Sequence, residues 1–99
     1  MLYELVTSPT AFRETGNAYD YYENQSPGLG DRFLKSLEDA YQKLTTSPQH
    51  SGYINSRKDI RDMKIHVFPF IIVFQIVEDK VLVLRVFNTN GNPLSIKNL

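Results

Sequence analysis

The C-terminal half of the chain alternates between apolar and other side chains, as half-buried β-strands do. One parity of residues 70–76 is entirely apolar: Phe70, Ile72, Phe74 and Ile76. A matching set follows on the next segment: Leu82, Leu84 and Val86. Because successive side chains of a strand point to opposite faces, we expect both sets to line one face of a sheet and to form the core. A third strand is expected just before them, over residues 60–67.

The opposite parity of the same segments is mixed in character. It carries Gln75 and Arg85 among apolar residues (Ile71, Val73, Val83 and Phe87) and leads into the amides of Asn88 and Asn90. A half-apolar face of this kind is a plausible working or partner-binding surface.

The N-terminal half changes to a helical period after a short strand at residues 2–6. Ser8 is a good N-cap, and Pro9 suits the first helical position, where its missing N–H group leaves nothing unpaired. Gly16 weakens this helix and is expected to let a neighbour approach closely. The pattern breaks at residues 24–28, which contain a proline followed by a glycine.

A second helix is expected over residues 29–45, with a stronger apolar stripe: Leu29, Phe33, Leu37, Ala40, Tyr41 and Leu44. Two helices joined by so short a break are expected to form an antiparallel hairpin. Residues 50–57 have the composition of an exposed connection. The sequence therefore predicts one α+β domain over residues 1–99 in the order β-α-α-β-β-β, an antiparallel sheet with the helical hairpin packed on one face.

Composition excludes several classes of protein. Eleven basic and eleven acidic residues cancel, which argues against a dedicated or sequence-specific nucleic-acid binder. The absence of cysteine rules out disulfides and thiolate metal sites and fits a reducing cytoplasm. The first residues do not have the pattern of a signal peptide, and the longest apolar run is too short to span a membrane.

Several short clusters, taken in order, resemble the RelE/ParE superfamily of bacterial toxins from type II toxin–antitoxin modules. They are Pro27-Gly28-Leu29-Gly30-Asp31-Arg32-Phe33, Leu44-Thr45-Thr46-Ser47-Pro48, Ile60-Arg61, Phe68-Pro69-Phe70 and Ile72-Val73-Phe74. The resemblance covers nearly the whole chain. It implies a cytoplasmic toxin of the kind involved in plasmid stabilization and growth inhibition, with no cofactor and with a cognate antitoxin as partner. The antitoxin would lie along the helical hairpin or extend the sheet.

The resemblance leaves two kinds of target open. The ParE branch implies binding to DNA gyrase, whereas RelE-type members cut messenger RNA on the ribosome. After the last strand the family commonly has a His, then an Arg before a Pro, then an aromatic. In this chain the positions that resemble these three are occupied by Asn88, Gly91 and Ile96. Ile71 stands where RNA-cleaving members often have an Arg. These departures favour a binding toxin, or a degenerate toxin that only binds its antitoxin, over an endoribonuclease.

RNA cleavage needs a proton-transfer group and positive charge on the phosphate. The candidates are Lys64, His66 and Arg85, with His66 the histidine that strand parity places beside Lys64. The alternative, that Lys64 and His66 are the solvated side of a half-buried strand, is favoured because a second proton-transfer group is missing nearby.

Two arginines have a binding interpretation beside a structural one. Arg61 matches an arginine of the family, yet its parity suggests that it pairs with a carboxylate at the edge of the sheet. Arg85 lies among apolar residues and must reach water, a carboxylate or an anionic ligand. The candidate partner-binding residues are Arg61, Arg85, Phe87, Asn88 and Asn90.

The remaining aromatic and histidine residues add little chemistry. Tyr19 and Tyr22 fall on the apolar stripe of the first helix, which leaves Tyr21 as the spare ring. His50 has no companion ligand, so no metal site is expected.

Overall fold

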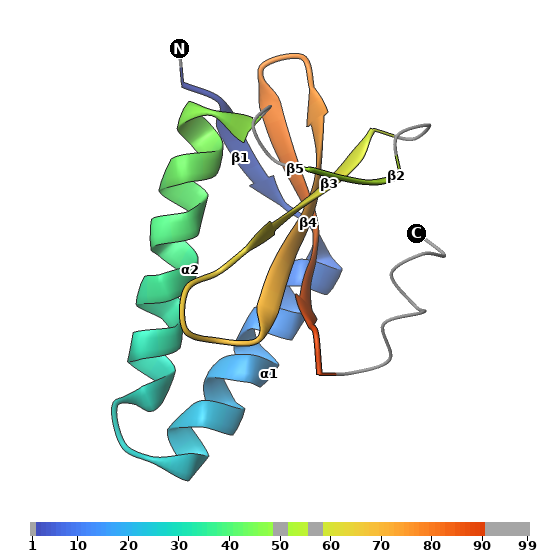
Figure 1. Cartoon of the computed structure of the whole chain (residues 1–99). Helices are drawn as coiled ribbons and strands as arrows, with labels where there is room; N and C mark the ends of the chain where they lie inside the picture. The colour runs from blue at the N-terminus through green and yellow to red at the C-terminus, as the bar shows by residue number, and fades with distance from the viewer. Residues whose placement is uncertain (1, 49–51, 56–58, 91–99) are drawn as a thin grey trace.

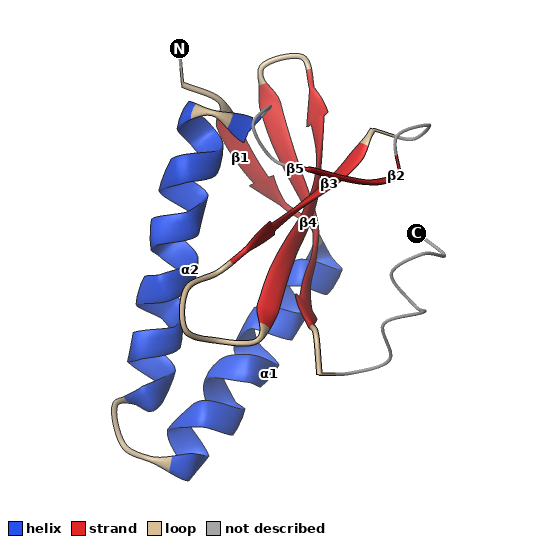
Figure 2. Cartoon of the chain, viewed as in Figure 1, coloured by secondary structure: helices blue, strands red, loops and turns tan. Residues whose placement is uncertain are grey.

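The computed structural model describes residues 2–48, 52–55 and 59–90. Its elements follow one another in this order: β1 (Glu4–Thr7), α1 (Pro9–Gln25), α2 (Leu29–Thr46), β2 (Gly52–Asn55), β3 (Ile60–Lys64), β4 (Phe70–Val77) and β5 (Lys80–Asn88). The two helices form a hairpin that covers one face of the sheet (Figures 1 and 2). The predicted α+β class and helical hairpin are confirmed, and the predicted elements occur in the expected order with one further strand, β2, after α2.

The sheet has five strands in the order β1-β5-β4-β3-β2. It differs from the expected sheet in two places. β1 pairs with β5 in parallel, while the other three pairs are antiparallel. A parallel neighbour is possible here because the long helical connection can carry the chain back across the sheet. β2 lies inside the segment that was expected to be an exposed connection, and it pairs with β3.

Ser8 joins the start of α1 to the last strand. Its hydroxyl oxygen accepts a hydrogen bond from the N–H of Ala11 at 3.0 Å, which is the predicted N-cap, and Pro9 occupies the first turn. The same hydroxyl donates to the carbonyl of Leu84 at 2.8 Å. One side chain therefore fixes the helix start and its position along β5.

The connection between the helices relies on Glu23. Its carboxylate accepts hydrogen bonds from the N–H groups of Gly28 and Gly30, at 3.1 and 3.0 Å, where α2 has no side-chain cap of its own. A negative charge at this end of a helix also complements the helix dipole. Gly28 has φ +86°, which glycine adopts without strain.

The close contact between the helices occurs at Gly30 and not at Gly16, where it was expected. A Cβ atom on Gly30 would lie 2.8 Å from the Tyr19 ring, whereas one on Gly16 would have no atom within 4 Å. The helices therefore approach near their connection and leave open space beside Gly16.

The main core lies between the hairpin and the sheet. Four rings form its centre: Tyr22, Phe33, Phe68 and Phe70, with centroid separations from 4.8 to 6.2 Å. The apolar parity predicted for β4 is confirmed, since Phe70, Ile72 and Phe74 are all buried in this cluster. Tyr19 and Tyr22 are half-buried, and Tyr21 is 59% exposed. The interpretation of Tyr21 as the spare ring is confirmed.

The apolar set predicted for β5 is wrong in its first part. A β-bulge interrupts the pairing with β4: Val73 pairs with Arg85, but Phe74 pairs with Val83, so Leu84 is the extra residue. A bulge inserts one residue and resets the alternation. Val81 and Val83 before the bulge, and Val86 after it, contribute to the helix-covered core. Leu84 instead packs on a second cluster, formed by Ile60, Ile71, Val73 and Phe87.

In the described part of the chain, neither helix is long and apolar enough to cross a membrane.

Candidate partner-binding site

Arg85 is held by a carboxylate of the same chain. Its Nε lies 3.0 and 2.9 Å from the two carboxylate oxygens of Glu14, and its Nη2 lies 2.6 Å from Oε2. The guanidinium group also stands 5.2 Å from the centre of the Phe87 ring. These hydrogen bonds to Glu14, with burial opposing them, raise the pKa of Arg85 above its already high ordinary value. We expected the Arg85 charge to reach water, a carboxylate or an anion. In the structure it is paired with a carboxylate of the same chain.

Glu14 also bonds to the outer edge of β5. Its Oε1 accepts a hydrogen bond from the N–H of Val86 at 3.0 Å. β1 pairs with β5 only as far as Thr7 and Val83, so beyond that point the helix supplies the acceptor that a neighbouring strand would offer. Sequence reasoning missed Glu14 because 71 residues separate it from Arg85; the one available signal was the need of a mid-strand arginine for a carboxylate.

Arg61 has a carboxylate neighbour close to it in the chain. Its Nε lies 3.3 Å from Oδ1 of Asp59, and its side chain is only 11% exposed. The expected pairing with a carboxylate is present, but β3 lies between β4 and β2, so Arg61 is not at the edge of the sheet.

Lys64 and His66 lie close together but apart from Arg85. Both line a cavity of about 260 Å³ against α2, together with Ser36, Asp39 and other residues. β3 ends at Lys64, so strand parity does not apply to His66, which belongs to the following loop. That loop is bonded to α2 through the Ser36 hydroxyl, which donates to the His66 carbonyl. Arg85 belongs to β5, which is separated from β3 by β4.

The other predicted partner-binding residues lie at the end of β5. Phe87 is 6% exposed and belongs to the second cluster. Asn88 and Asn90 are exposed, and the Asn88 side chain accepts the N–H of Asn90 at 2.8 Å in a tight local turn. The backbone and side chain of Asn88 are therefore displayed at the surface, whereas the Phe87 ring is mostly covered.

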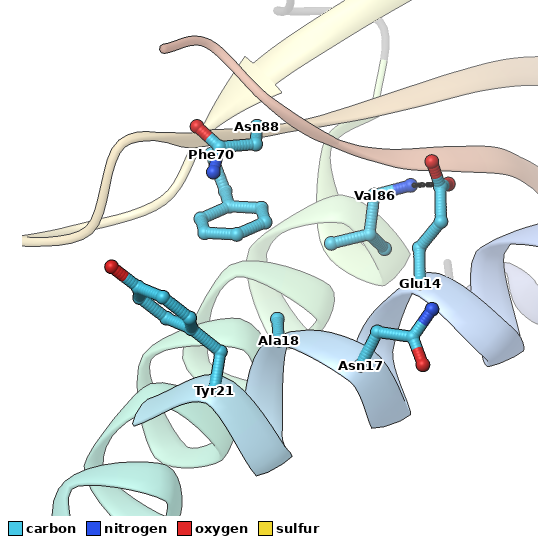
Figure 3. A pocket seen from close by; sticks show the side chains of 7 residues that line it. All are labelled: Glu14, Asn17, Ala18, Tyr21, Phe70, Val86 and Asn88. Atoms are coloured by element: carbon cyan, nitrogen blue, oxygen red, sulfur yellow. Dashed lines mark hydrogen bonds between the residues drawn. The ribbon is translucent and has the colours of Figure 1, made fainter. Parts of the chain in front are cut away.

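A cavity of about 270 Å³ opens beside this end of β5, between the strand and α1 (Figure 3). Its apolar lining comes from Ala18, Phe70 and Val86, and the rings of Tyr21 and Phe70 stand at one side of it. Asn17 and Asn88 add amides to the lining. Among these residues the sequence analysis singled out only Tyr21 as a spare group and Asn88 as a candidate.

A second hollow runs along the outer side of the hairpin. It measures about 290 Å³ and is lined by Phe12, Thr15, Gly16, Tyr19, Asp20 and Leu34. Phe12 is 76% exposed, and the open space beside Gly16 deepens the hollow. We call it the hairpin groove.

Within residues 2–48, 52–55 and 59–90 no cluster of three or more His, Cys, Asp or Glu side chains could hold a metal ion.

A sequence model for the family described as "ParE toxin of type II toxin-antitoxin system, parDE" matches residues 5–93. The chain belongs to the ParE toxin family. Membership confirms the resemblance to the RelE/ParE superfamily that the sequence clusters predicted.

The fold of this ParE-family chain is also similar to a solved structure described as "Chromosomal ParDE TA system from P. aeruginosa". The TM-score is 0.76 at 17% sequence identity, over 88% of this chain and 96% of the other. At this identity the likeness concerns the fold. No curated protein sequence matches the chain.

Proposed function

We propose that this ParE-family chain is a toxin that acts by binding a protein in the cell and that a cognate antitoxin neutralises it. DNA gyrase is the target that the resemblance to the ParE branch implies, and the cytoplasm is the compartment in which both partners would meet it.

The observation that carries this proposal is the bonding of Arg85 to Glu14. A ribonuclease needs cationic groups preorganised around the phosphate where charge develops. Arg85, one of the three candidates for that role, is already bonded to a carboxylate and lies apart from Lys64 and His66. The geometry therefore favours binding over RNA cleavage.

The hairpin groove supports the antitoxin part of the proposal. An amphipathic helix binds an apolar groove through side chains spaced one turn apart. Phe12 and Leu34 offer apolar contacts on α1 and α2, and Gly16 lets a partner helix approach between them. The antitoxin helix would bury a phenylalanine ring that is otherwise exposed to solvent.

The test of toxicity is induced expression in a bacterial host, with growth, transcript integrity and chromosome replication followed in the same culture. We expect growth arrest with intact transcripts and stalled chromosomes. The variants His66→Ala and Lys64→Ala should still arrest growth. Arrest with cleaved transcripts that disappears in His66→Ala would instead support the ribosome-dependent endoribonuclease. Antitoxin binding without any arrest would support a degenerate toxin.

The test of neutralisation uses a variant in the hairpin groove. Gly16→Leu fills the open space beside α1, so toxicity should remain while co-expressed antitoxin no longer rescues growth. Gly16→Ala, which adds one methyl group and raises helix propensity, is the matched control and should still be rescued. Full rescue of Gly16→Leu would place the antitoxin elsewhere.

A further inference from the structure

The loop between β3 and β4 holds a valine in a backbone conformation that valine avoids. Val67 has φ +76°, and a β-branched side chain in this left-handed region is a genuine outlier. Two other described non-glycine residues with positive φ, Asp59 and Glu78, are not β-branched. Val67 is also 72% exposed, so its side chain is not placed there to fill the core. Such a conformation costs free energy and persists only where the neighbouring structure imposes it.

Both flanks of Val67 are anchored to the rest of the fold. On one side, the Ser36 hydroxyl on α2 donates a hydrogen bond to the His66 carbonyl. On the other side, the Phe68 ring belongs to the aromatic centre of the core, with its centroid 5.4 Å from that of Phe33. The loop therefore lies against α2 (Figures 1 and 2) and holds Val67 outward as a fixed apolar projection.

Basic side chains surround this projection. Val67 lines a hollow of about 230 Å³ that adjoins the cavity of Lys64 and His66, because Ser36, Asp39 and His66 line both. The basic residues that line the two hollows are Arg32, Lys35, Lys43 and Lys64. Asp39 is the one carboxylate among the lining residues, and its Oδ1 lies 3.7 Å from Nζ of Lys35. In a chain of zero net charge, positive charge is thus concentrated beside Val67.

We call this surface the loop patch: Val67 with Arg32, Lys35, Lys43, Lys64 and His66. An apolar centre inside a charged rim is the usual anatomy of a protein–protein interface. A basic rim attracts and orients an acidic partner. Nucleic acid fits less well, because the Asp39 carboxylate would face its phosphates and the Val67 methyl groups would gain no apolar contact.

We propose that the loop patch is the surface through which this toxin contacts its cellular target, and that the target presents an acidic protein segment with an apolar site for Val67. This inference rests on the proposed function, since it names the surface that binds the target. The hairpin groove shares no lining residue with the two hollows, so target binding and antitoxin binding can be separated by mutation. Lys64 and His66 stand on the rim, where removal of one side chain weakens a complex only slightly. Growth arrest by their alanine variants is therefore still expected.

A test of the apolar projection uses two asparagine variants. Asparagine adopts a positive φ more readily than valine or glutamate, so Val67→Asn and Glu78→Asn should each unfold at or slightly above the temperature of the unmodified protein. Val67→Asn also removes the apolar contact, and roughly fivefold more toxin should then be needed for half-maximal growth arrest. Glu78→Asn, in the β4–β5 turn, is the matched control and should be as potent as the unmodified chain. Equal potency of the two variants, with toxin levels compared by immunoblot, would overturn the inference.

A test of the basic rim compares two charge reversals. Arg32 and Arg13 are both exposed arginines near the start of a helix, where glutamate is well tolerated. Arg32→Glu should require roughly fivefold more toxin for arrest, whereas Arg13→Glu, outside both hollows, should not differ from the unmodified chain. In calorimetric titrations Arg32→Glu should bind the antitoxin with unchanged affinity. An equal loss of antitoxin binding would mean general damage and would overturn the assignment to the target.

The chemical class of the partner has its own measurement. The unmodified toxin is titrated into a short fluorescent DNA duplex at low salt and followed by anisotropy, and we expect no saturable binding. Saturable binding that Arg32→Glu abolishes would assign the loop patch to nucleic acid and overturn the inference of an acidic protein segment.

The two proposals fail in different ways. If the unmodified chain does not arrest growth, the proposed function fails and this inference with it. If the unmodified chain arrests growth and both Val67→Asn and Arg32→Glu are equally potent, the toxin function stands and only the loop patch is excluded.

Discussion

The two halves of β5 have different neighbours. Residues 80–83 lie between two strands, β1 and β4, and Val81 and Val83 are fully buried. Among the described residues, β4 is the only strand beside residues 85–88, and on their other side the helix α1 supplies the carboxylate of Glu14. The bulge at Leu84 separates the two halves.

The difference shows how a side chain can replace a strand in part. A neighbouring strand satisfies both N–H and C=O groups along an edge, whereas a carboxylate accepts hydrogen bonds and donates none. Glu14 therefore satisfies the Val86 N–H and the Arg85 side chain but cannot donate a hydrogen bond to the Val86 carbonyl. The half without a neighbouring strand is therefore only partly satisfied by α1.

The largest expected loss of stability comes from a truncation in the main core, next to both halves of β5. Phe74 is fully buried and follows Val73, where the register shifts. Truncation to Ala should lower the free energy of unfolding by about 3–5 kcal/mol, because it removes a ring and leaves a cavity. Urea unfolding measures the change, and a loss below about 1 kcal/mol would contradict the placement of Phe74.

The carboxylate that replaces the strand is the next target. Glu14→Ala leaves Arg85 unpaired at 27% side-chain exposure and removes the acceptor of the Val86 N–H, so it should cost about 2–3 kcal/mol. Thermal and urea unfolding provide the measurement. In a double-mutant cycle, Arg85→Met should recover part of the loss, because the unpaired charge is then gone. Additive losses would mean that the pair contributes little.

Because the bulge resets the alternation of β5, truncations on its two faces should lower the free energy of unfolding by unequal amounts. Val83→Ala should lower stability by about 2 kcal/mol, since its side chain is fully buried. Leu82→Ala should cost roughly 1 kcal/mol, because Leu82 is only half-buried. The same unfolding experiments compare the two variants. A larger loss of stability for Leu82→Ala than for Val83→Ala would contradict the bulge and support the uninterrupted alternation expected from the sequence.

The smallest effect concerns the row of paired residues next to the bulge. Asp62 pairs with Val73, which pairs with Arg85. Burial raises the pKa of Asp62 above its ordinary 3.8, with the charge of Lys64 partly opposing this. A raised carboxyl pKa means that stability falls as pH rises through the folded pKa. Asp62→Asn should therefore stabilise the protein at pH 7 by up to about 0.5 kcal/mol, and the gain should vanish below pH 3.8. A gain that persists in acid would contradict this cause.

The elements governed by local patterns could be predicted from the sequence. Ser8 and Pro9 fix the start of α1, and the apolar stripe containing Phe33 and Leu37 identifies α2. The extra residue of the bulge lies in β5, so β4 keeps its alternation and the parity of Phe70, Ile72 and Phe74 was enough to place them in the core.

Features set by distant pairing could not be predicted in the same way. The bulge at Leu84 depends on how two strands are matched, and no residue in β5 marks it. Glu14 has the composition of an ordinary exposed helical residue until α1 is placed beside β5. The role assigned to Gly16 belongs to Gly30, because the point of closest approach depends on how the two helices cross.

The bonds between Ser8 and β5 set the order in which this protein can fold. Ser8 donates to the carbonyl of Leu84 across 76 positions of the chain, and β1 pairs with β5 over a similar separation. Contacts of such high sequence separation form late and slowly. During synthesis, the first strand and the start of α1 have no β5 to pair with until the last strand has been made. The sheet can therefore be completed only when nearly the whole chain is present.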